Sequence, residues 1–306
     1  MRSLALLAAT LVLLPAAVGA QTRDENWSRC GDPNGNPDLV IGACTALIQS
    51  GRESTADLAT AFYNRGTSRG RKSENDKALE DFDQAIKLAP TYAKAFYNRG
   101  VIHRRLDQTD LALQDYNSAL ANDAANAAAL NNRGNIYRDK GQYDLALRDH
   151  NEAIRIEPTA NRHLSRGNDY FARSENDRAL ADYDQAIKLD ANYAEAFNNR
   201  CVVKAATGRG QEALADCDAS LRIRPNDAGT LANRGIAYLA LKNYDAALST
   251  YESALKADAK SAYALFGRGV TKRRKGDIAG GDADIAAAKA IKADIADQMA
   301  KYGVKP

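Results

Sequence analysis

The stretch YNRGVIHRRLDQTDLALQDYNSALAND (97–123) contains the pattern that decides the fold. Its deciding positions are Gly100, Ala112, Tyr116 and Ala119, in that order. These positions keep helical spacing on two segments of about a dozen residues each, separated by a polar turn. We therefore expect two helices that approach closely at their small residues, while the large ring fills the space left beside the glycine.

The same pattern recurs along most of the chain. The glycine position recurs at nearly equal intervals and is occupied by Gly66, Gly100, Gly134, Gly167, Cys201, Gly235 and Gly269. One helix pair cannot bury its apolar face alone, so the copies should stack into a solenoid. The expected units are residues 59–92, 93–126, 127–159, 160–193, 194–227, 228–261 and 262–293.

These features resemble the tetratricopeptide repeat family in their period, in the glycine, alanine, aromatic and alanine spacing, and in Pro90, Pro158 and Pro225 at unit ends. The resemblance implies an all-α solenoid of seven helix–turn–helix repeats whose first helices line an inner surface. It also implies a non-enzymatic scaffold that binds a protein or an extended peptide in its concave groove.

One position departs from the family pattern. The leucine that is usual just before the glycine is replaced by arginine in every copy: Arg65, Arg99, Arg133, Arg166, Arg200, Arg234 and Arg268. An aspartate precedes the large residue in each copy except the sixth, which has Thr250: Asp81, Asp115, Asp149, Asp182, Asp216 and Asp284. A recurring opposite-charge pair predicts a structural ion pair between the two helices or between adjacent units.

The segments that flank the repeats are predicted to be caps, which cover the apolar faces of the terminal units. Residues 21–58 form the N-terminal cap, with a helix over residues 36–51, and residues 294–306 form the C-terminal cap, with a helix over residues 293–303. The combination of Trp27, Cys30 and ACTALI (43–48) is similar to the lead-in of exported repeat proteins of alphaproteobacteria.

The first twenty residues are typical of a cleaved signal peptide. Arg2 precedes an apolar run from Leu4 to Leu14, and the small residues Val18 and Ala20 precede the expected cut. This run is short of the roughly 20 residues that span a bilayer, which disfavours the alternative of an uncleaved anchor. We expect a periplasmic or secreted protein that is not inserted in a membrane after cleavage.

The charges of the mature chain are close to balance. Without residues 1–20 it has 41 basic and 39 acidic side chains, so it has no overall electrostatic attraction for nucleic acid. Cys30 with Cys44 and Cys201 with Cys217 form two close pairs in sequence, and an oxidising compartment favours two local disulfides. Cys201 and Cys217 occupy the glycine and large-residue positions of one unit, where the alternative is two buried free thiols.

Asparagine recurs two residues before the glycine, and these asparagine positions are Asn64, Asn98, Asn132, Asn199 and Asn233. Ser165 and Gly267 are the exceptions. An offset of two residues turns a helix by about 200°, nearly opposite the glycine. On the stacked first helices implied by the resemblance, they form a ladder that could bind peptide backbone, because an amide both donates and accepts. The alternative is that they contact only solvent.

No catalytic set is recognisable, and no cofactor is expected. The three histidines occupy positions that other copies fill with aromatic or large residues. His150 and His163 could approach each other between units three and four, which leaves a metal-binding or enzymatic protein as an alternative. A purely structural envelope component is a further alternative.

Overall fold

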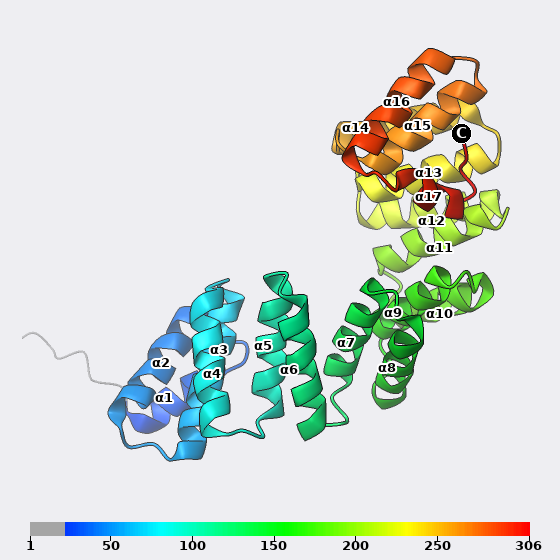
Figure 1. Ribbon diagram of the computed structural model, residues 1–306. Helices are drawn as coiled ribbons and strands as arrows, with labels where there is room; N and C mark the ends of the chain where they lie inside the picture. The colour runs from blue at the N-terminus through cyan, green and yellow to red at the C-terminus, as the bar shows by residue number, and fades with distance from the viewer. Residues whose placement is uncertain (1–21) are drawn as a thin grey trace, which may run out of the picture. The chain divides into compact units, whose positions relative to one another are not determined.

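The computed structural model describes residues 22–306, so the predicted signal peptide lies outside the described residues. Within that range all regular elements are helices, and they pack in consecutive pairs (Figure 1). The predicted all-α class, a solenoid of helical repeats, is confirmed. The chain divides into two compact units, with the boundary between Asn122 and Asp123.

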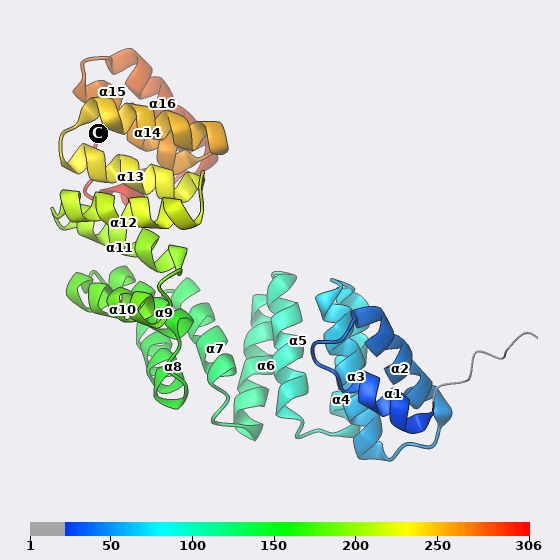
Figure 2. The same ribbon diagram turned by 180° about the vertical axis from the view of Figure 1, so that it is seen from behind.

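The first unit begins with two helices that precede the pairs. Its helices are α1 (Arg23–Cys30), α2 (Pro37–Ser50), α3 (Thr55–Arg71), α4 (Asn75–Leu88), α5 (Ala93–Arg105) and α6 (Thr109–Asn122). The helix expected over residues 36–51 is α2, and α1 is an additional helix that the sequence did not predict. Figure 2 shows α1 and α2 beside α3, and α2 packs on both of its neighbours.

The second unit contains five helix pairs and a short last helix. Its helices are α7 (Ala127–Asp139), α8 (Tyr143–Ile156), α9 (Ala160–Ala172), α10 (Asn176–Leu189), α11 (Ala194–Ala206), α12 (Gly210–Ile223), α13 (Ala228–Ala240), α14 (Tyr244–Ala257), α15 (Ala262–Arg274), α16 (Ile278–Ile291) and α17 (Ile295–Lys301). The odd-numbered helices α3 to α15 are called first helices below, and the even-numbered helices α4 to α16 are called second helices.

Local sequence explains why several first helices begin where they do. The side chains of Ser54, Asn126, Thr159, Asp227 and Ser261 precede these helices and accept hydrogen bonds from backbone N–H groups in the first turn. This satisfies donors that have no partner within the helix. The starts of these helices are therefore fixed by the residue immediately before each helix.

The glycine position explains how closely the two helices of a pair approach. A Cβ atom added to Gly100 would lie 2.8 Å from Cε1 of Tyr116, and one added to Gly134 would lie 2.7 Å from Nε2 of His150. Neither distance leaves room for a carbon atom in a close-packed core. The buried side chain of the second helix thus occupies the space that the glycine leaves, as the spacing predicts.

The N-terminal cap is held by a disulfide and a buried carboxylate. Cys30 at the end of α1 bonds to Cys44 of α2, and both are almost fully buried. The carboxylate of Glu53 accepts hydrogen bonds from Trp27 Nε1 at 3.0 Å and from Arg23 Nη2 at 2.7 Å. Hydrogen bonds from Arg23 lower the pKa of Glu53. These contacts join the leading helix to the segment that enters α3.

The second predicted disulfide is also present. Cys201 of α11 and Cys217 of α12 are joined, and neither side chain is exposed to solvent. No helix among residues 22–306 is both long enough and apolar enough to span a membrane.

Candidate functional site

The arginine before the glycine pairs with the aspartate of the second helix in the same helix pair. The N–O distances range from 2.5 Å for Arg200–Asp216 to 2.8 Å for Arg65–Asp81, and the other pairs are Arg99–Asp115, Arg133–Asp149, Arg166–Asp182 and Arg268–Asp284. The aspartates are buried, so these are charge-assisted contacts inside the repeat. The predicted structural ion pair is confirmed for these copies.

Some of these arginines also reach the preceding second helix. Arg99 contacts Asp83 at 2.6 Å, and the hydrogen bond with Asp115 raises the pKa of Arg99. Arg234 of the sixth copy, which has Thr250 in place of the aspartate, instead pairs with Asp218 of the preceding helix pair at 2.8 Å. Arg99 therefore joins two second helices to one first helix, which leucine at this position could not do.

The asparagine positions lie at the seam between consecutive first helices. Asn199 Nδ2 donates to Asn168 Oδ1 at 2.8 Å, and Asn233 Nδ2 donates to Asn198 Oδ1 at 2.9 Å. All the asparagine positions are half-buried. The amide donors of these two residues are thus used within the protein.

The first unit shows the same arrangement. Asn98 Nδ2 donates to Thr67 Oγ1 at 3.1 Å and to Tyr63 Oη at 3.2 Å, so α5 is joined to α3. Asn64 lies beside the N-terminal cap, with Nδ2 4.0 Å from Cys30 Sγ. Among these asparagines, the ones with described amide contacts align neighbouring helices or the cap rather than facing only solvent.

The structure explains why Gly267 interrupts the asparagine series. A Cβ atom on Gly267 would lie 2.3 Å from Cζ and 2.5 Å from Oη of Tyr251. Tyr251 is fully buried, and its ring extends from α14 toward α15. The ring therefore occupies the space that an asparagine side chain would need.

His150 and His163 each have a separate carboxylate partner. His150 Nδ1 lies 2.5 Å from Asp169 Oδ2, and His163 Nδ1 lies 3.0 Å from Asp182 Oδ1. No group of three or more His, Cys, Asp or Glu side chains that could hold a metal ion occurs among residues 22–306. The two histidines, which sequence analysis considered together, belong to two different hydrogen-bonded pairs.

Sequence analysis missed Asp169 as the partner of His150. Asp169 lies two residues after the glycine position, where the copies before and after it have Ile136 and Val203. It is completely buried. A charged residue at a repeat position that is uncharged in the other copies, together with a histidine at a usually aromatic position of the preceding copy, is a pattern that comparison of the repeats could have detected.

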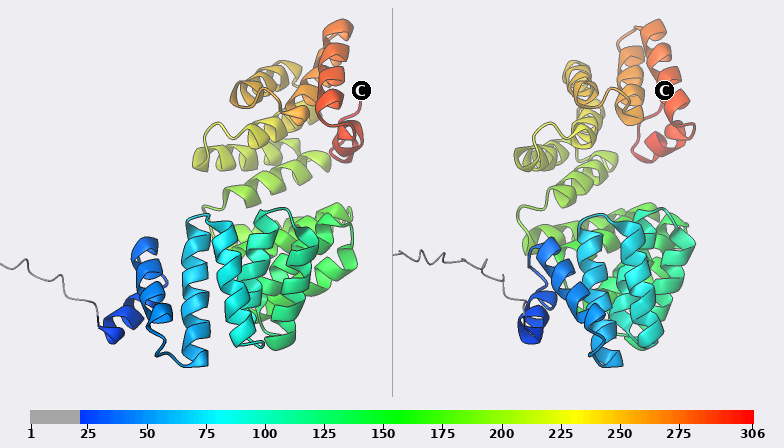
Figure 3. Two further views of the ribbon diagram at one scale, coloured as in Figure 1. Left: turned by 60° about the vertical axis from the view of Figure 1, so that its left-hand side comes forward. Right: turned by 90° about the vertical axis from the view of Figure 1, so that its left-hand side faces the viewer.

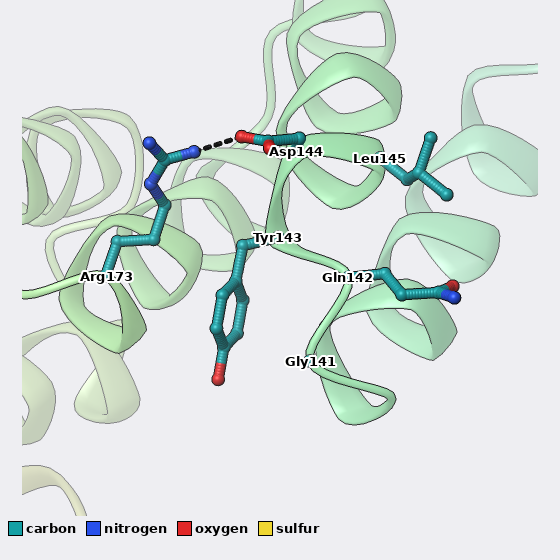
Figure 4. Close-up of a pocket in the computed structure, with 6 residues that line it drawn as sticks. All are labelled: Gly141, Gln142, Tyr143, Asp144, Leu145 and Arg173. Atoms are coloured by element: carbon teal, nitrogen blue, oxygen red, sulfur yellow. Dashed lines mark hydrogen bonds and ion pairs between the residues drawn. The ribbon is translucent and has the colours of Figure 1, made fainter.

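A shallow depression of about 350 Å³ lies at the turn between α7 and α8 (Figure 4). Arg173 forms an ion pair with Asp144 across it, while the ring of Tyr143 points away from this pair (Figure 4). Arg173 also contacts Glu175 at 2.7 Å. The depression is occupied by paired charges and brings together no nucleophile and base.

Family comparison identifies the repeat. Models described as tetratricopeptide repeat match residues 63–125, 127–159, 192–260 and 233–298, and one described as TPR repeat matches residues 167–208. The chain belongs to the tetratricopeptide repeat family. No curated protein matches the sequence.

Several solved structures are similar to this one. YrrB, described as a TPR protein with an unusual peptide-binding site, is 25% identical with a TM-score of 0.50, over 61% of this chain and 97% of YrrB. A tetratricopeptide repeat protein from Parabacteroides merdae is 20% identical with a TM-score of 0.65, over 80% of this chain and 98% of that one. A chain of the APC/C hetero-tetramer Cut9–Hcn1 is 17% identical with a TM-score of 0.66, over 92% and 54%. The last two likenesses show the fold alone.

Proposed function

We propose that this protein is an exported, non-enzymatic scaffold that binds a protein or an extended peptide on the face formed by its first helices. The observation that carries the proposal is the alignment of consecutive first helices by hydrogen bonds from the asparagine positions. Such bonds fix the spacing of the side chains that a bound segment would meet, which reduces the ordering cost of binding.

Family membership supports this function. Tetratricopeptide repeats are a protein-interaction fold, and YrrB, a relative at 25% identity, is described as having a peptide-binding site. A polar face with amide groups suits main-chain recognition, in which the peptide backbone supplies donors and acceptors. In this proposal the asparagine side chains mainly orient the first helices. The exposed parts of these side chains contact the bound segment.

Export is supported by two independent features. The predicted signal peptide directs secretion, and both cysteine pairs are joined, which suits an oxidising compartment. The absence of enzymatic activity is proposed because His150, His163 and the aspartates that pair with the repeated arginines are used in structural pairs.

A photo-cross-linking experiment tests the binding face. Asn161 is exposed and lies six residues before its glycine, at the start of α9, whereas Ala181 is exposed on the second helix α10. A photoreactive residue is placed at one position or the other in the full chain. After irradiation in envelope extract, we expect discrete cross-linked proteins only with the Asn161 variant. The same products from both positions, or none from either, would overturn the proposal.

A further inference from the structure

The C-terminal segment of the protein consists of α17 and the five residues that follow it. In α17, Ile295 and Met299 are fully buried, and α17 packs on α15 and α16, so this helix caps the last pair. The residues that follow it, 302–306, stay packed on the second unit: Val304 is buried, and its N–H donates to the main-chain oxygen of Met299 at 3.0 Å. Figure 3 shows this end of the chain in dark red beside the helices of the same unit.

Tyr302 bridges two first helices that are far apart in sequence. Its ring stacks on Phe171 of α9, with ring centroids 5.9 Å apart and planes within 10°. It also lies 6.4 Å from the ring of Tyr263 at the start of α15. One side chain of the tail therefore contacts the first helices of the fourth and seventh repeats.

Polar contacts hold the segment on both sides of Tyr302. The hydroxyl of Tyr263 donates to Oε1 of Gln298, and Arg274 Nη2 donates to the main-chain oxygen of Lys305 at 3.3 Å. Burial raises the pKa of Tyr302 to about 12. Aromatic anchors are typical of binding hot spots, and hydrogen bonds to the main chain are typical of peptide recognition.

The position of Tyr263 connects this contact to the proposed binding face. Tyr263 lies six residues before the glycine of its repeat, as Asn161 does in α9, so both belong to one register of the first helices. Positions four residues apart lie on the same side of a helix, which places this register next to the asparagine positions. Through Tyr263, the tail thus reaches the face that the proposed function assigns to a partner.

We propose that residues 302–306 are an intramolecular pseudo-ligand, and that the partner of this face is an extended peptide whose aromatic side chain displaces Tyr302 from Phe171 and Tyr263. This inference rests on the proposed function and names the class of its partner. Because the tail is tethered, it competes at an effective concentration in the millimolar range. The intact chain therefore binds a competing peptide more weakly than a chain without the tail does.

The test compares the full chain with a variant that ends at Lys301. This variant keeps Ile295 and Met299 of α17 but loses the buried Val304, so circular dichroism and thermal unfolding check that the last helix pair stays folded. The probe is a fluorescent peptide of residues 297–306, DQMAKYGVKP, followed by anisotropy. We expect the shortened chain to bind it at least about tenfold more tightly than the full chain does.

Matched variants locate the binding. In the shortened chain, Phe171→Leu keeps an apolar side chain without a ring and should weaken peptide binding about tenfold or more, since an aromatic stack is lost. Tyr143→Ala is the control, because Tyr143 lines the depression at the turn between α7 and α8, which no residue of the tail lines. A Tyr302→Ala probe should bind as weakly as the wild-type probe binds the Phe171→Leu chain.

The possible failures are distinguishable. Equal binding of the probe by the full and shortened chains, or no binding by either, overturns the pseudo-ligand proposal. So does equal loss of binding in the Phe171→Leu and Tyr143→Ala variants. After either result, cross-linking from position 161 and not from position 181 would still support the proposed function. A lack of such position-dependent cross-linking would overturn the proposed function.

Discussion

The imidazole of His150 and the carboxylate of Asp169 form a completely buried pair between α8 and α9, with Nδ1 and Oδ2 2.5 Å apart. The other ring nitrogen, Nε2, lies 3.2 Å from the main-chain oxygen of Asn131. Both ring nitrogens therefore face acceptor oxygens. The second oxygen of the carboxylate lies 3.7 Å from Arg138 Nη1. In the first unit, Phe82 and Ile102 occupy the equivalent positions in one apolar cluster.

Breaking this pair on one side should be strongly destabilising. His150→Ala leaves the carboxylate of Asp169 buried without its partner, which costs about 3–5 kcal/mol. The double variant His150→Phe/Asp169→Ile copies Phe82 and Ile102 and should recover most of that loss, since a buried polar pair replaced by apolar residues is often neutral. Urea unfolding measures the free energy of unfolding of the single and the double variant. A double variant as unstable as the single one would contradict this account.

The disulfide between Cys201 and Cys217 should be a structural crosslink. Replacing both residues by serine should reduce the free energy of unfolding by about 3 kcal/mol, because the closed loop has the length of about half a repeat. Cys201→Gly/Cys217→Tyr restores the pair found in other repeats and should recover part of the loss. Reductant should lower the melting temperature of the wild type more than that of this variant. Four reactive thiols in unreduced, unfolded protein would refute both disulfides.

Gly267 and Gly42 should respond in opposite ways to alanine. At Gly267 the added carbon would lie 2.3 Å from the ring of the buried Tyr251, so Gly267→Ala should cost about 1–3 kcal/mol. Gly42 is exposed within α2, and nothing lies within 4 Å of an added Cβ. Gly42→Ala should therefore stabilise the protein by up to about 1 kcal/mol through helix propensity. Equal effects of the two substitutions on thermal unfolding would be inconsistent with the packing described.

The asparagine positions should contribute to stability as well as to binding. Asn199→Ala removes the 2.8 Å bond to Asn168, whose Oδ1 also accepts from Tyr183, and should cost about 1 kcal/mol. Asn192 is exposed in the turn before α11, so Asn192→Ala should change stability by less than about 0.5 kcal/mol. Chemical denaturation compares the two. Equal free energies of unfolding for the two variants would mean that the hydrogen bonds between first helices do not contribute to stability.

Asp284 should make the last helix pair sensitive to acid. Burial acts to raise its pKa, but hydrogen bonds from Arg268 and Lys272, at 2.7 Å and 2.9 Å, outweigh burial and lower it. A carboxylate with a lowered folded-state pKa stabilises the protein above its unfolded pKa of about 4, and the contribution is lost as the pH falls through the folded value. Asp284→Asn should thus be less stable than wild type at pH 7.

The pH dependence of that difference is the measurement. Urea midpoints of wild type and Asp284→Asn should differ most above about pH 5 and converge below about pH 4. Asp282 is exposed on the same helix, and Asp282→Asn is the control, with a smaller effect at neutral pH. A difference that grows toward acidic pH would mean that the ionised Asp284 does not stabilise the folded protein.

The fold was predictable because the deciding contacts lie within one repeat. Gly100 and Tyr116 belong to the same helix pair, as do Arg99 and Asp115, so the same spacing appears in copy after copy. Cys201 and Cys217 were predicted for the same reason, since they replace the two members of one such contact. A local rule repeated many times can be detected in the sequence without knowledge of how the repeats stack.

The candidate site was predicted less completely. The series of asparagines was detected, but the acceptors that Asn98, Asn199 and Asn233 contact lie on the neighbouring first helix, roughly one repeat earlier in the chain. Asp169 was missed because its partner lies in a different repeat. Contacts of this kind depend on how one helix pair is rotated against the next.

The sequence by itself determined the helix pairs, the arginine–aspartate ion pair in every repeat except the sixth and the two disulfides, because each of these follows from short separations in the chain. Only the tertiary structure decided that the asparagine amides join first helices and that Tyr302 lies between Phe171 and Tyr263. Side chains that are distant in sequence meet there because stacked pairs bring their first helices together on one face. No periodicity in the chain specifies which residue of the tail reaches that face.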